Sequence, residues 1–129
     1  MSITIAWDNQ DKTILKGTVA PPFTWEELFD QWDIAAEMIR SMPHPVHLIV
    51  ISQSTGFPPG NALAQLNRIS TNVPQNLGLA IMVTTNRFIA LINSTLFKLS
   101  PRFSRRGRVA SSLDEAYALI AAEVVPELR

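Results

Sequence analysis

The chain has 129 residues, 47% of them hydrophobic and 17% charged, which is enough for one domain with a substantial core and too short for two of ordinary size. Its eleven basic and eleven acidic residues cancel, so the global field that draws proteins to nucleic acids or anionic membranes is missing. No cysteine occurs, which excludes disulfides and thiolate chemistry, and no apolar run approaches the roughly 18 residues of a membrane span. We therefore expect a single cytoplasmic domain over residues 1–129, with no transmembrane segment and no nucleic-acid partner.

The N-terminal segment has the pattern of a β-hairpin. Residues Ile3 to Trp7 alternate apolar and polar side chains, and Thr13 to Val19 form a second run of strand-forming residues. The polar residues from Asp8 to Lys12 between them favour a turn. These features predict two antiparallel strands.

A helix is predicted after Pro21-Pro22. Thr24 and Glu27 have the spacing of a capping box, in which each side chain can satisfy a backbone amide at the start of a helix. Apolar residues then recur at steps of three and four, at Leu28, Trp32, Ala35, Ile39 and Met42. This stripe predicts a helix that packs on a sheet, with Trp25 and Trp32 in the core.

Two runs, Val46 to Ile51 and Leu77 to Val83, are rich in β-branched residues and hardly alternate, which is typical of strands covered on both faces. Between them, residues 61–71 carry Leu63, Leu66 and Ile69 at three-residue spacing and predict a crossover helix. A right-handed crossover makes the two strands parallel, and we expect them to be neighbours.

The last third continues the alternation. Asn86 can cap a helix that Pro101 ends, Arg108 to Ala110 can form a short edge strand, and Ser112 to Glu115 repeats the capping-box spacing. The expected core positions of these two helices are Ile89, Ile92, Leu96, Leu99, Ala116, Leu119, Ile120 and Val124. The order ββαβαβαβα predicts an α/β fold with a mixed, mostly parallel sheet and covering helices.

Four segments together resemble the SpoIIAA-like fold of STAS domains, which is also related to lipid-carrying CRAL-TRIO (SEC14-type) domains. They are the opening hairpin, the helix start at Thr24 to Leu28, the strand from His44 to Ile51, and Ser111 to Ala116. Resemblance to anti-sigma-factor antagonists implies a non-enzymatic regulatory module that binds another protein. The relation to CRAL-TRIO domains implies an alternative, a carrier of a small ligand or lipid.

The sequence departs from this family at the phosphorylation switch. In anti-sigma-factor antagonists the switch is a serine in an Asp-Ser-Ser-Gly-type motif at the start of the helix after the central strand. The corresponding stretch here, Phe57 to Ala62, contains neither the aspartate nor a serine. Ser52 and Ser54 lie slightly earlier, so phosphorylation of a serine near this site is left open.

Polar residues follow both buried strands, at the sheet edge where open α/β folds usually bind ligands. The candidates are Ser52, Ser54, Thr55, Asn61, Thr84, Thr85, Asn86 and Arg87. Because each loop leads into a helix N-terminus, these side chains could hold an anion. Alternatively the asparagines cap the helices and the hydroxyls satisfy turn amides, which is the interpretation we favour.

A basic stretch precedes the edge strand and holds five of the eleven basic residues: Lys98, Arg102, Arg105, Arg106 and Arg108. It could meet an acidic partner, or it could be a solvated linker. Phe57, Phe97 and Phe103 are candidates for an exposed apolar patch, which leaves homodimerisation open.

No familiar catalytic signature occurs, such as a nucleophile elbow, a phosphate-binding glycine loop or a His-Glu-x-x-His motif. His44 and His47 point to opposite faces of an extended chain and have no carboxylate at ligand spacing. We therefore expect no catalytic residues, no metal and no cofactor, and an unidentified protein as the partner.

Overall fold

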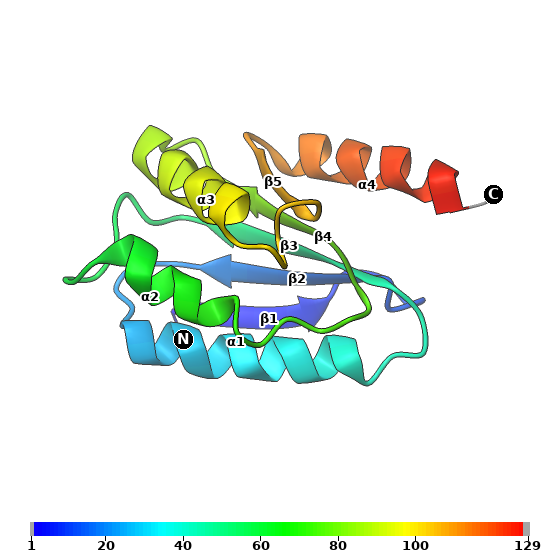
Figure 1. Cartoon of the computed structure of the whole chain (residues 1–129), viewed down its shortest axis with the longest axis horizontal. Coiled ribbons are helices and arrows are strands. Elements are labelled where there is room, and N and C mark those ends of the chain that lie inside the picture. Colours follow the sequence, from blue (N-terminus) through cyan, green and yellow to red (C-terminus); the bar gives the residue numbers. More distant parts are fainter. Residues whose placement is uncertain (1, 128–129) are drawn as a thin grey trace.

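The computed structural model describes residues 2–127, with side chains as far as residue 123. It has the predicted element order and class, five strands in one mixed sheet and four helices (Figure 1). The elements are β1 Ile3–Trp7, β2 Ile14–Val19, α1 Trp25–Arg40, β3 Val46–Ser52, α2 Ala62–Ile69, β4 Leu77–Val83, α3 Arg87–Leu99, β5 Gly107–Ala110 and α4 Leu113–Glu127.

The strands lie in the sheet in chain order, β1-β2-β3-β4-β5. β1 pairs with β2 antiparallel, and every other pair is parallel. The prediction that β3 and β4 are parallel neighbours is confirmed: Val50 lies opposite Met82, and Ile51 opposite Val83. Because β2 to β5 all run the same way, the loops that follow β3 and β4 leave the sheet at one edge, and the loops that lead into β4 and β5 lie at the other.

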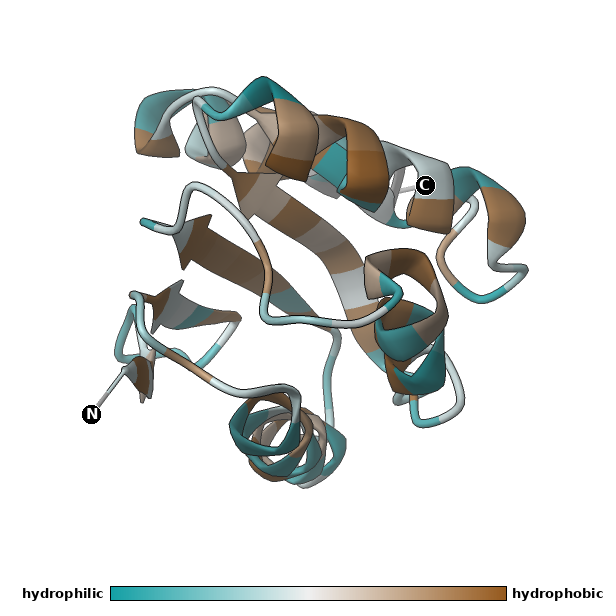
Figure 2. Ribbon diagram, turned by 90° about the vertical axis from the view of Figure 1, so that its left-hand side faces the viewer, coloured by the Kyte–Doolittle hydropathy of each residue, from teal (hydrophilic) through white to brown (hydrophobic). Residues whose placement is uncertain are grey.

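Helices cover both faces of the sheet. Ala35 and Ile39 of α1 pack with Leu48 and Ala80 on one face, where α2 and α3 contribute Ile69 and Phe97. On the other face α4 packs Ala116 and Ile120 against Ile49, Leu79 and Ile81. Val124, also expected in this core, lies outside the described side chains. Figure 2 looks at the C-terminal ends of the parallel strands and shows helices on both sides of the sheet.

Each helix begins where its capping residue predicts. The side chains of Thr24, Asn61 and Asn86 accept hydrogen bonds from the amides of Glu27, Ala64 and Ile89, at 3.0, 3.1 and 2.9 Å. At α4 the amide of Glu115 donates to Ser112, while the Glu115 carboxylate accepts from Ser111. α2 ends at Ile69, two residues earlier than predicted, because the hydroxyls of Ser70 and Thr71 bond back to the last carbonyls of the helix.

The tryptophans of α1 lie toward the interior, as predicted, and also hold loops in place. Trp25 is 9% exposed and donates its indole N–H to the carbonyl of Pro59 at 3.0 Å. Trp32 donates in the same way to the carbonyl of Asn72 at 2.9 Å. An indole buried with its N–H satisfied adds a directional bond to its apolar contacts. These two residues thus fix the loops that precede and follow α2.

His47 fills an irregularity between β3 and β4. The register shifts between Val46 and Leu48, and the Nδ1 atom of His47 accepts a hydrogen bond from the amide of Leu79 at 2.9 Å. Gly78 makes this possible, because a Cβ atom there would overlap the imidazole ring. His47 therefore has a structural role in the sheet. Within the described residues, no group of three or more His, Asp or Glu side chains could hold a metal ion.

A polar cluster ties α4 to the hairpin. Asp8 accepts hydrogen bonds from Tyr117 at 2.8 Å and from Lys16 at 3.0 Å. Burial alone would raise the pKa of Asp8, but the hydrogen bonds from Lys16 and Tyr117 outweigh burial and lower this pKa. The hydrogen bond to Asp8 raises the pKa of Lys16, and burial together with the same carboxylate raises the pKa of Tyr117. At neutral pH Asp8 is therefore ionised, Lys16 is protonated and Tyr117 is neutral, which are the forms that these hydrogen bonds require.

Candidate functional site

The loops after β3 and β4 meet at one edge of the sheet, as predicted (Figure 2). We call this region the loop edge, residues 52–61 and 84–87. The Nδ2 group of Asn86 donates a hydrogen bond to the carbonyl of Thr55 at 3.3 Å and links the two loops. The eight candidate residues are therefore gathered in one region.

Five of the eight candidate side chains of the loop edge are nevertheless engaged with nearby backbone groups. Ser54 is buried, and its hydroxyl donates to the carbonyl of Gly56 at 2.6 Å. The hydroxyl of Ser52 accepts from the amide of Ser54, and the hydroxyl of Thr84 accepts from the amide of Asn86. Together with the caps by Asn61 and Asn86, these bonds occupy backbone amide donors that an anion would need. The geometry favours the capping interpretation.

Three loop-edge candidates remain uncommitted. Thr55, Thr85 and Arg87 are exposed, and none of their side chains forms a hydrogen bond or an ion pair with a described residue. Two exposed hydroxyls and one exposed guanidinium do not by themselves make a binding site. The other five candidates of the loop edge are committed to caps and turns.

The outer surface of α3 carries large apolar side chains in contact with solvent. Phe88, Leu91 and Leu99 are 50%, 61% and 67% exposed. At 100° per residue these three positions and Thr95 fall on one side of the helix, over a length of roughly 16 Å. Ile34 on α1, at 50%, is the other large apolar side chain this exposed among the described residues. We call Phe88, Leu91 and Leu99 the α3 surface.

Aromatic rings connect the α3 surface to the loop edge. Phe57 stacks on Trp25, with ring centroids 5.6 Å apart and an interplanar angle of 13°. Its other neighbour is Phe88, which meets it edge to face at 5.8 Å and 64°. Because Trp25 is anchored in the core, these contacts hold the start of α3 and the loop before α2 in a fixed relation.

A groove runs between α2 and α3 beside this surface. It has a volume of about 430 Å³. Leu63 and Ala64 of α2 and Leu96 and Leu99 of α3 form its apolar walls, and Asn61 and Asn67 add amide groups. A groove with apolar walls and polar edges is suited to an apolar side chain or helix of a partner.

The position of this apolar surface differs from the sequence prediction. Phe103 is only 3% exposed, because its ring packs on Phe97 at 5.4 Å and on Trp32 at 6.4 Å. Leu99 was expected in the core and is instead exposed. Apolar residues recur at steps of three and four along two overlapping sides of α3. Only the position of the sheet decides which of these two sides is buried. Phe88 and Leu91 were missed for that reason.

The interior on the side of α1–α3 contains small apolar cavities. One of them has a volume of about 90 Å³ and lies between β3, β4 and the helices, next to Trp32, Leu66 and Phe103. Two others, of about 50 and 40 Å³, lie beside β1–β2 and below the loop edge. For comparison, a cavity that binds benzene has a volume of about 150 Å³.

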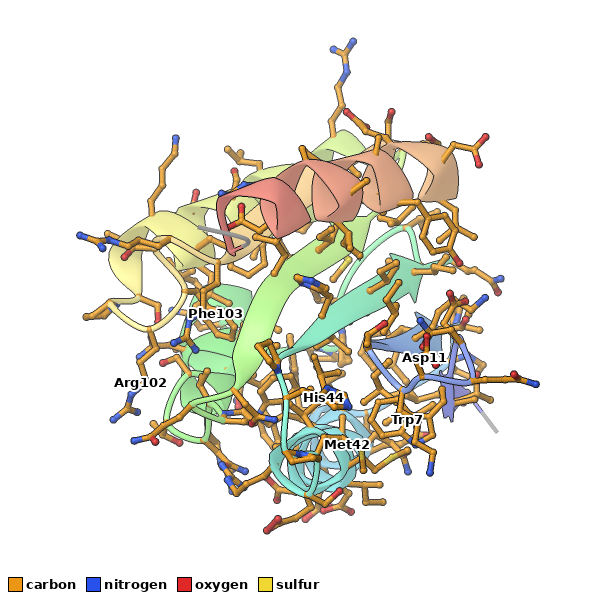
Figure 3. The ribbon with its side chains drawn as sticks, turned by 90° about the vertical axis from the view of Figure 1, so that its right-hand side faces the viewer. Trp7, Asp11, Met42, His44, Arg102 and Phe103 are labelled. Carbon is orange, nitrogen blue, oxygen red and sulfur yellow. The ribbon has the colours of Figure 1, made fainter. Side chains whose placement is uncertain are left out.

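The basic stretch lies at the opposite edge of the sheet from the loop edge. Arg102, Arg105 and Arg106 line a surface pocket of about 350 Å³, which we call the arginine pocket. Figure 3 looks at this edge and shows Arg102 pointing outward, while the neighbouring Phe103 points inward. Lys98 lies in the last turn of α3, and Arg108 donates to the carbonyls of Arg105 and Gly107. Three of the five basic residues are therefore gathered and two are not.

Comparison with known proteins finds no match among family models, curated proteins or solved structures. The resemblance to STAS domains accordingly stays a hypothesis that rests on the quoted segments. Among the described residues, no helix has both the length and the apolar character needed to cross a bilayer.

Proposed function

We propose that this chain is a non-enzymatic binding module that presents the α3 surface to a protein partner. The observation that carries the proposal is the exposure of Phe88, Leu91 and Leu99, at 50–67%, along one side of a single helix. Exposed apolar side chains that are scattered singly are ordinary, but several on one face mark an interaction surface. Their side chains lose contact with water only when another molecule covers them.

The surroundings of the α3 surface support a protein as the occupant. The groove beside Leu99 is open to solvent, and asparagine amides at its edge can bond a partner's polar groups. Phe57 and Phe88 extend the apolar area to the loop edge. A regulatory role in the cytoplasm, as in the STAS domains that the chain resembles, belongs to this proposal.

The proposal is tested by removing the apolar character of α3. The double variant Leu91→Lys/Leu99→Lys places charges on two exposed positions, so the fold is retained. The matched control is Ile34→Lys, a similar change on α1, where the side chain is 50% exposed. We expect the wild type and the control to recover the same protein from native lysate. Calorimetry with that purified protein should then give an affinity at least about tenfold lower for the double variant.

Two results would contradict the proposal. One is recovery of the same protein with equal affinity by all three forms. The other is repeated recovery of none. A second copy of the chain is a competing occupant, and light scattering across a concentration series distinguishes it: a dimer that the double variant abolishes assigns the α3 surface to self-association.

The alternative function is that of a carrier for a small ligand or lipid. The apolar cavity of about 90 Å³ under α1–α3 is the observation in its favour, because its walls include Trp32, Leu66 and Phe103. Its volume counts against it, since ligand pockets usually measure about 300–1,000 Å³. Native mass spectrometry of the purified chain separates the two functions. A mass increment from a bound lipid in repeated preparations supports the carrier.

A further inference from the structure

The arginine pocket lies where two loops meet, at the edge where β4 and β5 begin. The loop from α3 to β5 supplies Arg102, Ser104, Arg105 and Arg106, and the loop from α2 to β4 supplies Val73 and Gln75. The pocket is therefore separated from the loop edge by the length of the sheet. It also does not include any residue of the α3 surface.

The positive charge of this pocket is not neutralised by the rest of the described chain. The ion pairs among described residues join Lys16 to Asp8 and Arg40 to Glu37, and none involves Arg102, Arg105 or Arg106. Three guanidinium groups around one pocket repel one another, and no described carboxylate forms an ion pair with any of them. Here the charge is left for an external anion.

Two of the arginines are held in position by the opposite loop. Arg102 donates from Nη1 to the carbonyl of Ser70 at 3.0 Å, and Arg106 donates from Nη1 to the carbonyl of Pro74 at 3.2 Å. A guanidinium has five N–H donors, so each retains donors for a ligand. Because these side chains are already held in place, they lose less conformational entropy when a ligand binds. The arrangement is thus preorganised.

A purely structural role explains part of this arrangement. Ser70 is the C-cap of α2, and a cation near the C-terminus of a helix is stabilised by the exposed carbonyls. That role accounts for Arg102, while the bond of Arg106 to the carbonyl of Pro74 braces the loop before β4. It does not account for Arg105, which is exposed and forms no side-chain hydrogen bond or ion pair with a described residue. Arg105 therefore distinguishes a binding site from a pair of structural contacts.

We propose that the arginine pocket binds an organic phosphate monoester, the group that a phosphorylated metabolite and a phosphatidic acid headgroup share. Arginine matches phosphate because its planar donors bond two oxygens at once. The volume of about 350 Å³ exceeds what a bare phosphate needs, since a water-sized group takes about 30 Å³. Val73 and Pro101 would contact the organic part, while Gln75 and Ser104 can bond its hydroxyls.

The test uses glycerol 3-phosphate as a soluble probe and vesicles of phosphatidylcholine with phosphatidic acid as a lipid probe, because both present the same phosphate monoester. Backbone amide spectra of the full chain locate the site during titration, and vesicle flotation measures lipid binding. Arg105→Gln removes a charge from the pocket without breaking a contact that holds the fold. The matched control is Arg87→Gln, an exposed arginine at the loop edge.

We expect saturable shifts at Gln75 and Ser104, an affinity at least about tenfold lower for Arg105→Gln, and no change for Arg87→Gln. Binding to the soluble probe alone identifies a free metabolite as the source, and binding to vesicles alone identifies a lipid headgroup. The proposal is overturned if neither probe binds, if the shifts lie at the loop edge, or if Arg105→Gln binds like the wild type. Binding of an RNA oligonucleotide or an acidic peptide in place of both phosphates also overturns it.

Discussion

At the loop edge, hydroxyls and amides are numerous, yet five of the eight candidate side chains bond to nearby backbone groups. At the opposite edge, three arginines surround one pocket, and no carboxylate of the described chain pairs with them. Parallel sheets usually bind ligands at the first of these edges, because helix N-termini point there. This protein satisfies those N-termini internally with Asn61 and Asn86. Each cap takes one of the free amides that a ligand at the helix N-terminus would otherwise use.

The largest expected effect on stability comes from a substitution of Gly107, at the edge with the arginine pocket, and Gly56 at the loop edge serves as its comparison. Gly107 begins β5, and a Cβ atom there would overlap the ring of Phe97, whereas a Cβ atom at Gly56 meets nothing within 4 Å. We expect Gly107→Ala to lower the free energy of unfolding by about 2–3 kcal/mol through overpacking. Gly56→Ala should change it by less than about 0.5 kcal/mol. Urea denaturation followed by circular dichroism measures both, and equal values for the two variants would contradict the packing argument.

A smaller effect tests whether the loop edge is committed to capping. Asn86→Ala removes the cap of α3 and the bond to Thr55, so we expect a loss of about 1–2 kcal/mol. Asn86→Ser retains a capping oxygen but cannot reach Thr55 in the same way, and should recover most of this loss. Thermal and urea unfolding compare the two variants. A stability unaffected by Asn86→Ala would mean that the amide is free for a ligand after all.

The smallest expected effect on stability concerns the polar cluster of Asp8, Lys16 and Tyr117. In this cluster a carboxylate pairs with the positive charge, whereas the arginine pocket has no such pair among the described residues. Asp8→Asn should cost about 1 kcal/mol at neutral pH, because two hydrogen bonds to a carboxylate weaken. The pKa of Asp8 is lowered from its ordinary 3.8, so its contribution is complete above that value and disappears as the pH falls through the lowered pKa. Unfolding free energies measured from about pH 7 down to about pH 2 should therefore converge for variant and wild type. A difference that persists at the acid end would assign the effect to packing.

Much of the fold could be predicted because local signals and the global architecture agree. Thr24, Asn61 and Asn86 cap helices in the structure as their spacing in the sequence predicts. The two apolar runs are adjacent parallel strands, as their β-branched residues and lack of alternation predict for strands covered on both faces. The errors are confined to element ends, such as the early end of α2, where side chains of Ser70 and Thr71 compete with the helix.

The candidate sites were less predictable, because they depend on contacts between distant segments. The sequence placed the basic residues in one stretch but did not separate Arg102, Arg105 and Arg106 from Lys98 and Arg108. That division arises from the carbonyls of Ser70 and Pro74, which lie 32 positions earlier in the chain. Likewise, Leu99 is exposed because the sheet covers the other side of α3, and Phe103 is buried because its ring packs on Trp32 and Phe97.

The sequence by itself determined the element order, the helix starts and the mostly parallel sheet, because capping and strand burial act over a few residues. Only the tertiary structure decided which apolar stripe of α3 faces solvent, which loop-edge groups are already bonded, and which arginines share a pocket. Those outcomes depend on the geometry of packing between elements, and no local pattern in the chain encodes them.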